Sequence, residues 1–273
     1  MRAAVTVSLI ALAGCRGATT PTVAPPPPPS WSPAMQAIAD GSNQFALDLY
    51  GHLRGKPGNL FFSPYSVHAA LAMTADGAAG TTRDQMTSVL HLPAGHDRTL
   101  VAGDLGWFYS AGDTPYELAV ANALWGQKGF PWRAEFLARQ KEHFGAGLHE
   151  ADFKKDPEAE RARINRWVEE QTKDRIKDLL QPGIVTPQTT MVLTNAIYFK
   201  GRWAEQFDKA QTRDGAFHLA DGKTVTVPLM HHSGTYRYGN VGGTQVLEMP
   251  YQGGDLSMVV VLPEKPDGLP ALE

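Results

Sequence analysis

The residue types that most often do chemistry are sparse in this chain of 273 residues. Its single cysteine is Cys15, which lies at the end of an apolar stretch near the amino terminus. Two of its nine histidines, His231 and His232, are adjacent in a segment typical of a β-strand. Neighbouring strand residues point to opposite faces of a sheet, so these imidazoles are not expected to share a metal ion. A solvent-facing or hydrogen-bonded histidine is the favoured interpretation of each.

Ser63 and Ser66 are the serines in the most suggestive surroundings, because they flank Pro64 where a helix is expected to begin. A serine before a helix commonly caps its first turn, and proline fits the first helical position. No nearby His-Asp arrangement would turn either serine into a nucleophile. The sequence also lacks the G-x-S-x-G elbow, the H-E-x-x-H helix, the phosphate-binding glycine loop and paired-cysteine metal patterns. These observations argue against an enzyme and indicate neither a metal nor a cofactor.

Residues 1–15 have the pattern of a bacterial export signal. Arg2 supplies a short positive start, residues 3–13 carry no charge, and the stretch ends in Leu-Ala-Gly-Cys. That last string resembles a lipobox, which predicts that Cys15 is lipidated and becomes the first residue of the mature chain. Acyl chains there would attach an exported protein to the bacterial cell envelope. The alternative is an ordinary cleaved signal with an incidental cysteine and an extracellular product.

Residues 16–33 include five consecutive prolines at positions 25–29, which predicts an extended, semi-rigid tether. A proline motif that binds a partner is the sharper alternative. The folded part is therefore expected at 34–273. Its charge is nearly balanced, since the whole chain has a net charge of −3, so nothing suggests a nucleic-acid partner.

The folded part mixes helices and strands, which predicts an α+β fold with large sheets. Helical spacing of apolar residues predicts helices at 35–53, 65–75, 100–109 and 131–144. Another helix is expected to be capped by Thr81 or Thr82 and to run through Leu90. A further helix is expected to open at Asp156 and to continue through Leu180. Apolar runs predict strands at 59–62, 116–125 and 190–199, followed by hairpins that turn at Asp221-Gly222 and Gly253-Gly254.

Two of the expected strands contain similar strings. One reads Ala-Asn-Ala-Leu-Trp at 121–125, and the other reads Thr-Asn-Ala-Ile-Tyr at 194–198. No fixed period joins them to further copies. The similarity therefore indicates equivalent environments in one sheet rather than an internal repeat.

Several longer strings resemble the serpins, the serine-protease-inhibitor superfamily. The amino-terminal signature matches NQFALDLYGHLRGKPGNLFFSPYSVHAALAMTADGAAGTTRDQM, and the middle of the family matches TNAIYFKGRWAEQFD, VPLMHHSGTYRYG and VLEMPYQGGDLSMVVVLPEK. The resemblance is collinear over 34–273. It implies a large central sheet, two further sheets and about nine helices in the complete family domain.

The resemblance also implies an activity that needs no catalytic residue of the inhibitor. In inhibitory serpins a reactive loop is cut by the target serine protease, or by a cysteine protease, and then inserts as a new strand into the central sheet. By resemblance, Ser63, Ser66 and Asn195 form the region where that sheet opens. Trp203 corresponds to the tryptophan where insertion begins, and the helix from Asp156 corresponds to the one lying across the sheet.

The resemblance further implies that this sequence holds only the amino-terminal two-thirds of a domain of roughly 350 residues. The remaining central strand, the reactive loop with its P1 residue and a histidine that pairs with the serines are expected beyond Glu273. We therefore expect a fragment of an inhibitor. The alternatives are a degenerate or non-inhibitory surface protein that acts by binding alone, and an enzyme that depends on Ser63.

Overall fold

A computed structural model describes residues 33–93, 115–219, 221–265 and 267–273. The export signal with Cys15, the tether up to residue 32 and the helix expected at 100–109 lie outside these ranges. The described residues form two compact units. The larger unit comprises residues 33–52, 62–93 and 115–200, and the smaller comprises the remainder.

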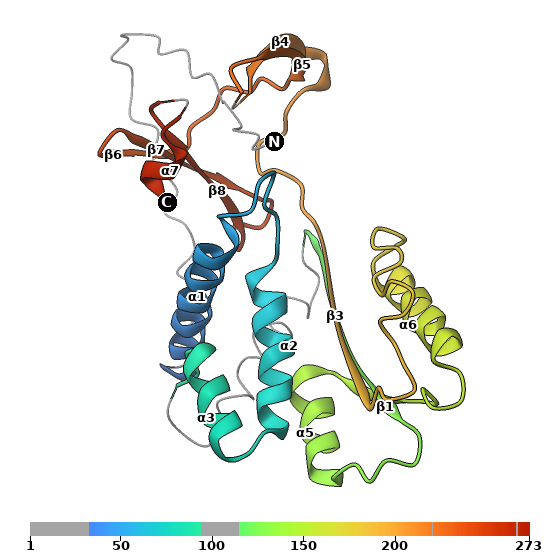
Figure 1. Ribbon diagram of the computed structural model, residues 1–273. Coiled ribbons are helices and arrows are strands. Elements are labelled where there is room, and N and C mark those ends of the chain that lie inside the picture. Colours follow the sequence, from blue (N-terminus) through green and yellow to red (C-terminus); the bar gives the residue numbers. More distant parts are fainter. Residues whose placement is uncertain (1–32, 94–114, 220, 266) are drawn as a thin grey trace, which may run out of the picture. The chain divides into compact units, whose positions relative to one another are not determined.

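The larger unit is built on a three-stranded sheet in the order β2-β1-β3. The central strand β1 pairs in parallel with β2 and antiparallel with β3. The strands are β1 (Glu117–Gln127), β2 (Gly147–Ala151) and β3 (Met191–Lys200). The sequence predicts β1 and β3, and helices cover both faces of their sheet (Figure 1).

Helix α6 lies on one face of this sheet, and α2 and α5 lie on the other (Figure 1). The helices of the unit are α1 (Pro33–Leu53), α2 (Pro64–Gly77), α3 (Gly80–Val89), α5 (Ala134–Phe144) and α6 (Pro157–Gln171). The core beside α1 and α2 contains Ile38, Phe45, Met73, Leu90 and Phe144. The core beneath α6 contains Trp125, Phe153 and Ile164. The sheet is therefore a central layer between two apolar cores.

The helix starts confirm one cap prediction and contradict another. Ser63 is the N-cap of α2, because its Oγ accepts a hydrogen bond from the backbone N–H of Ser66 at 3.2 Å. The prediction that Thr81 or Thr82 caps the next helix is wrong. Both lie inside α3, whose N-cap is Ala79 and has no side-chain hydrogen bond.

Two further predictions are wrong for related reasons. Residues 59–62 do not form a strand, because no described strand pairs with them, and the Phe61 side chain is 99% exposed. The helix from Asp156 does not continue through Leu180 but ends at Gln171. After it, Lys173 and Asp174 have φ angles of 50° and 60°, outside the helical region. An apolar pattern predicts which residues face a core. It does not determine whether a segment pairs with another strand, or where a helix ends.

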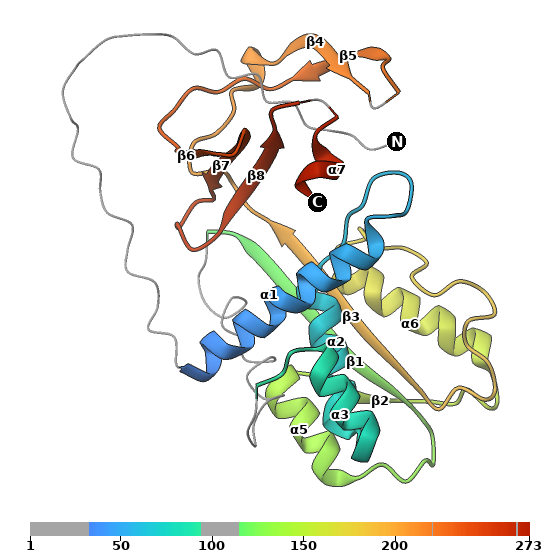
Figure 2. The ribbon, with the colours of Figure 1, turned by 60° about the vertical axis from the view of Figure 1, so that its left-hand side comes forward.

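The smaller unit contains a two-stranded and a three-stranded sheet, and both predicted hairpins are present. A short helix, α7, packs beside the last strand (Figure 2). The elements are η1 (Lys209–Gln211), β4 (Arg213–His218), β5 (Thr224–Leu229), β6 (Arg237–Val241), β7 (Thr244–Pro250), β8 (Ser257–Pro263) and α7 (Leu269–Leu272). The α+β class expected from the sequence is confirmed.

His231 and His232 are not in a strand, which corrects the interpretation that their side chains alternate across a sheet. They lie in an irregular segment between β5 and β6. His232 Nδ1 is 2.8 Å from the hydroxyl of Tyr236, and its Nε2 is 3.8 Å from a carboxylate oxygen of Glu205. His232 is thus a hydrogen-bonded histidine within the smaller unit. Among the described helices, none combines the length and apolar character that crossing a bilayer would require.

Candidate functional site

The two similar strings lie side by side in the sheet, with Asn122 of β1 directly opposite Asn195 of β3. Asn195 donates through Nδ2 to Oδ1 of Asn122 at 2.5 Å. Asn122 donates in turn through its own Nδ2 to the backbone carbonyl oxygen of Phe144 at 3.0 Å. This relay runs from the end of α5 to β3. It fixes the orientation of the Asn195 amide and leaves Oδ1 as its remaining acceptor.

That acceptor is buried and has no hydrogen-bond partner among the described residues. The Oγ of Ser66 is in the same condition. Ser66 lies in the first turn of α2, and α2 packs against β3, the strand that carries Asn195. Leaving a buried polar atom unpaired costs about 1–3 kcal/mol, so each of these two atoms requires an explanation.

Ser63 and Ser66 thus lie at the start of α2, and Asn195 lies on β3, which packs against that helix. Their role in sheet opening stays a prediction. Ser63 is already engaged as the helix cap, whereas Ser66 and Asn195 have free capacity. A hydroxyl can donate or accept, and an amide oxygen accepts. Each of these two atoms can therefore bind a side chain that carries a hydrogen-bond donor. Because the resemblance predicts that the sheet opens here, we call Ser63, Ser66 and Asn195 the sheet-opening cluster.

Asn122 is the residue that sequence reasoning missed. The repeated Ala-Asn-Ala and Thr-Asn-Ala strings were the available signal, since two asparagines in equivalent strand environments can meet across a ladder. Their register depends on how β1 and β3 pair, and one sequence does not specify that pairing. On the opposite face of the sheet, Trp125 and Thr194 are diagonal neighbours across the same two strands, and the indole N–H donates to the threonine hydroxyl at 3.1 Å.

A buried histidine lies on the same helix as the two serines. His68 is 1% exposed, and its Nε2 donates to the backbone carbonyl of Leu90 at 2.9 Å. Burial lowers the pKa of His68, although the hydrogen bond to Leu90 acts in the opposite direction. The imidazole is therefore neutral near pH 7 and serves packing between α2 and the end of α3.

Trp203 belongs to the smaller unit, whereas the sheet-opening cluster belongs to the larger one. Its ring stacks on Tyr251 with centroids 4.5 Å apart and planes 11° from parallel. Two backbone hydrogen bonds, from Ala204 to Pro250 and from Gln252 to Arg202, fasten this segment to the end of β7. Trp203 is therefore a half-buried, firmly packed aromatic in its own unit.

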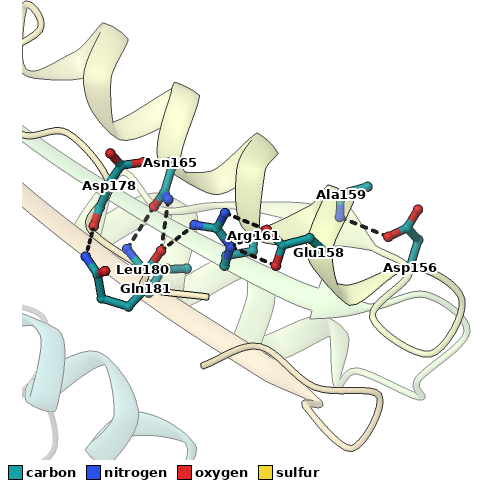
Figure 3. A network of polar contacts seen from close by, with 8 residues as sticks. All are labelled: Asp156, Glu158, Ala159, Arg161, Asn165, Asp178, Leu180 and Gln181. Atoms are coloured by element: carbon teal, nitrogen blue, oxygen red, sulfur yellow. Dashed lines mark hydrogen bonds and ion pairs between the residues drawn. The ribbon is translucent and has the colours of Figure 1, made fainter. Parts of the chain in front are cut away.

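Helix α6 is held on the sheet by its buried stripe and by polar contacts at both ends. Asp156 caps it by accepting the N–H of Ala159 at 2.9 Å. Asn165 binds both the N–H and the carbonyl of Leu180, at 2.8 and 3.0 Å, and so fastens the returning segment to the helix (Figure 3). Arg161 adds a bond to the same carbonyl at 2.6 Å. The helix and the segment after it form one clamped element.

Within the described residues no cluster of histidine, cysteine, aspartate and glutamate side chains is arranged to hold a metal ion. A model of the serpin (serine protease inhibitor) family matches residues 40–273.

Curated relatives agree with this match. An uncharacterized serpin-like protein of Methanosarcina mazei is 39% identical over 234 residues, which cover 83% of this chain and 54% of that protein. Leukocyte elastase inhibitor A of Rattus norvegicus is 39% identical over 84% of this chain and 62% of its own length. The chain thus spans about half the length of the archaeal relative.

Solved structures give the same result for the fold. Ovalbumin from emu, Dromaius novaehollandiae, superposes with a TM-score of 0.82 at 31% identity, over 86% of this chain and 66% of that one. A cleaved serpin 42Da superposes with a TM-score of 0.81 at 35% identity, over 88% and 65%. The family match, the relatives and the shared fold together establish that this chain belongs to the serpin family.

Proposed function

We propose that the protein carrying this chain inhibits serine-type endopeptidases, or cysteine proteases, by inserting a reactive loop into its central sheet. The family description names serine protease inhibitors, and relatives of known name include leukocyte elastase inhibitors. No catalytic group of the inhibitor is required, because the protease performs the cleavage. Insertion converts unpaired strand edges into paired ones, and this pairing drives the reaction.

The observation that carries the proposal is the pair of unpartnered atoms at the sheet-opening cluster. Ser66 Oγ and Asn195 Oδ1 are buried and ready to receive a donor. In the described part of the chain, β3 is hydrogen-bonded to a strand on one side only, since the sheet order is β2-β1-β3. A further strand beside β3 would pair its open backbone edge and could bring a donor to the cluster.

A panel of serine proteases tests this proposal on the protein expressed from its complete gene. Each protease is incubated with the inhibitor and the mixture is separated in denaturing detergent. The proposal expects a covalent, detergent-resistant complex with at least one protease and loss of that protease's activity. Cleavage of the protein with full release of active protease, across the panel, would contradict it. Stable association that detergent disrupts would instead indicate binding alone.

We further propose that lipid on Cys15 attaches the exported protein to the cell envelope. The support is the Leu-Ala-Gly-Cys string after an uncharged stretch. We expect Cys15→Ser to abolish incorporation of labelled fatty acid and to release the protein from the membrane fraction in a bacterial host. Labelling that persists in the variant would refute this attachment, whatever the outcome with proteases.

A further inference from the structure

Helix α6 meets the sheet at a cluster of aromatic rings over β1 and β2. Trp125 is 1% exposed and lies directly opposite His149 in the parallel ladder. The two rings stack, with centroids 4.4 Å apart and planes 23° from parallel. Trp167 of α6 contacts both rings, edge-on to Trp125 at 5.8 Å and tilted against His149 at 6.1 Å. The half-buried imidazole is thus enclosed between the sheet and the helix.

A permanent cation occupies the same cluster. The guanidinium carbon of Arg163 lies 5.0 Å from the centre of the Trp125 ring, within range of a cation–π interaction. Arg163 also donates to the backbone carbonyl of Glu150 at 2.6 Å and pairs with Glu160 at 2.7 Å. Arginine does not lose its proton in proteins, so this charge persists at every physiological pH. These contacts join α6 to β2 as well as to β1.

The surroundings of His149 favour its neutral form. From α6 the charged groups are Arg163 and its partner Glu160, and from β1 the facing residue is the uncharged Trp125. On its own strand Glu150 follows, and its side chain points to the other face of the sheet. Burial lowers the pKa of His149 below its ordinary value of 6.5, and the positive charge of Arg163 lowers it further.

We propose that neutral His149 stabilises the packing of α6 on the β1–β2 face, and that protonation of its imidazole weakens this packing. A protonated ring would place a second positive charge beside Arg163 against the same indole. As a control on sheet opening, this inference rests on the proposed function, because α6 covers the sheet into which a loop would insert.

The sign follows from the direction of the pKa shift. When α6 is detached, His149 returns to its ordinary pKa, and when α6 is attached the pKa is lower. Both states are neutral well above that ordinary value, so attachment is then at its strongest. As the pH falls below the ordinary pKa of histidine, the detached state binds the proton more readily, so its population increases. A difference of one pKa unit between the two states corresponds to a tenfold change in their ratio.

Hydrogen–deuterium exchange of the α6 amides in the complete protein tests the inference. Rates are measured at about pH 7.5 and about pH 5, on either side of the histidine range, and corrected for the intrinsic pH dependence of exchange. For the wild type we expect on the order of tenfold less protection in α6 at the lower pH, with β1 less affected. His149→Phe retains an aromatic stack without a titratable group, and we expect the same protection at both pH values.

The controls separate this inference from general acid sensitivity. His218→Phe replaces an exposed histidine of β4 in the smaller unit and should leave the acid response of α6 unchanged. His149→Gln, which also cannot titrate, should reproduce the flat response even if phenylalanine disturbs the packing. The inference would be overturned if α6 lost as much protection at the lower pH in both His149 variants as it does in the wild type. No protease is present in this assay, so its failure leaves the proposed inhibition untouched, and a failure of inhibition leaves it untouched in turn.

Discussion

Asn122 and Asn195 join the two long strands of the larger unit through a side-chain hydrogen bond as well as through the backbone ladder. The Asn122 carbonyl oxygen accepts from the Asn195 amide and fixes its orientation. The Oδ1 atom of Asn195 then remains available as an acceptor. The role of Ser63 as a cap was predictable from the sequence, whereas the role of Asn122 was missed because it depends on how the two strands pair. The unpaired state of Ser66 was not predictable either, because it depends on which groups the folded chain brings near.

We predict that Asn122→Ala destabilises the larger unit by about 1–3 kcal/mol, because it leaves the Asn195 amide and the Phe144 carbonyl without their partners. Urea unfolding monitored by circular dichroism measures the loss. Gln36→Ala, which removes an exposed hydrogen bond on the surface of α1, is the control and should change the free energy of unfolding by less than about 0.5 kcal/mol. Equal changes in the free energy of unfolding for the two substitutions would show that the hydrogen bonds of Asn122 do not stabilise the fold.

At the level of elements, the sequence predicted strands and hairpins better than helix ends. The hairpin turns carry Asp-Gly and Gly-Gly pairs, whose backbone preferences are local. The end of α6 is set by side-chain hydrogen bonds instead. The Thr172 hydroxyl donates to the carbonyl of Val168 at 2.8 Å and accepts the N–H of Ile176 at 3.1 Å, while Asn165 holds Leu180. Apolar residues with helical spacing after Gln171 therefore belong to a returning segment.

The segment after α6 also predicts a stabilising substitution. Asp174 is exposed and has a φ angle of 60°, a left-handed conformation that costs non-glycine residues about 1–2 kcal/mol. Glycine adopts it freely but loses more chain entropy on folding. We expect Asp174→Gly to stabilise the protein by about 0.5–1 kcal/mol in urea unfolding.

The matched control is Asp84→Gly, for which we expect a decrease in the free energy of unfolding. Asp84 is also exposed but lies within α3, where glycine is unfavourable by about 1 kcal/mol relative to good helix formers. Asp84→Gly should therefore destabilise the protein. If both glycine substitutions destabilise equally, the left-handed strain at Asp174 is negligible.

Across the described residues as a whole, β3 pairs with a strand on one side only, and several apolar side chains are exposed. Phe61 is 99% exposed although the sequence indicates a strand around it, and β8 exposes Met258, Val259 and Val261. Apolar character predicted these segments as strands. What covers them depends on chain pairing over long distances, which local patterns do not determine. This chain spans 54% of the length of a curated relative, so complete-protein assays carry the functional test.

Thermal unfolding of the protein expressed from its complete gene, before and after limited cleavage of its proposed reactive loop by a protease that does not remain attached, tests loop insertion most directly. The proposed insertion would add a strand beside β3 and a donor at the sheet-opening cluster, so the cleaved protein should unfold at a higher temperature. For a large domain each 1 kcal/mol corresponds to roughly 2–4 °C, so a gain of several kcal/mol is readily measured. An unfolding temperature that stays the same or falls after cleavage would contradict insertion as the mechanism.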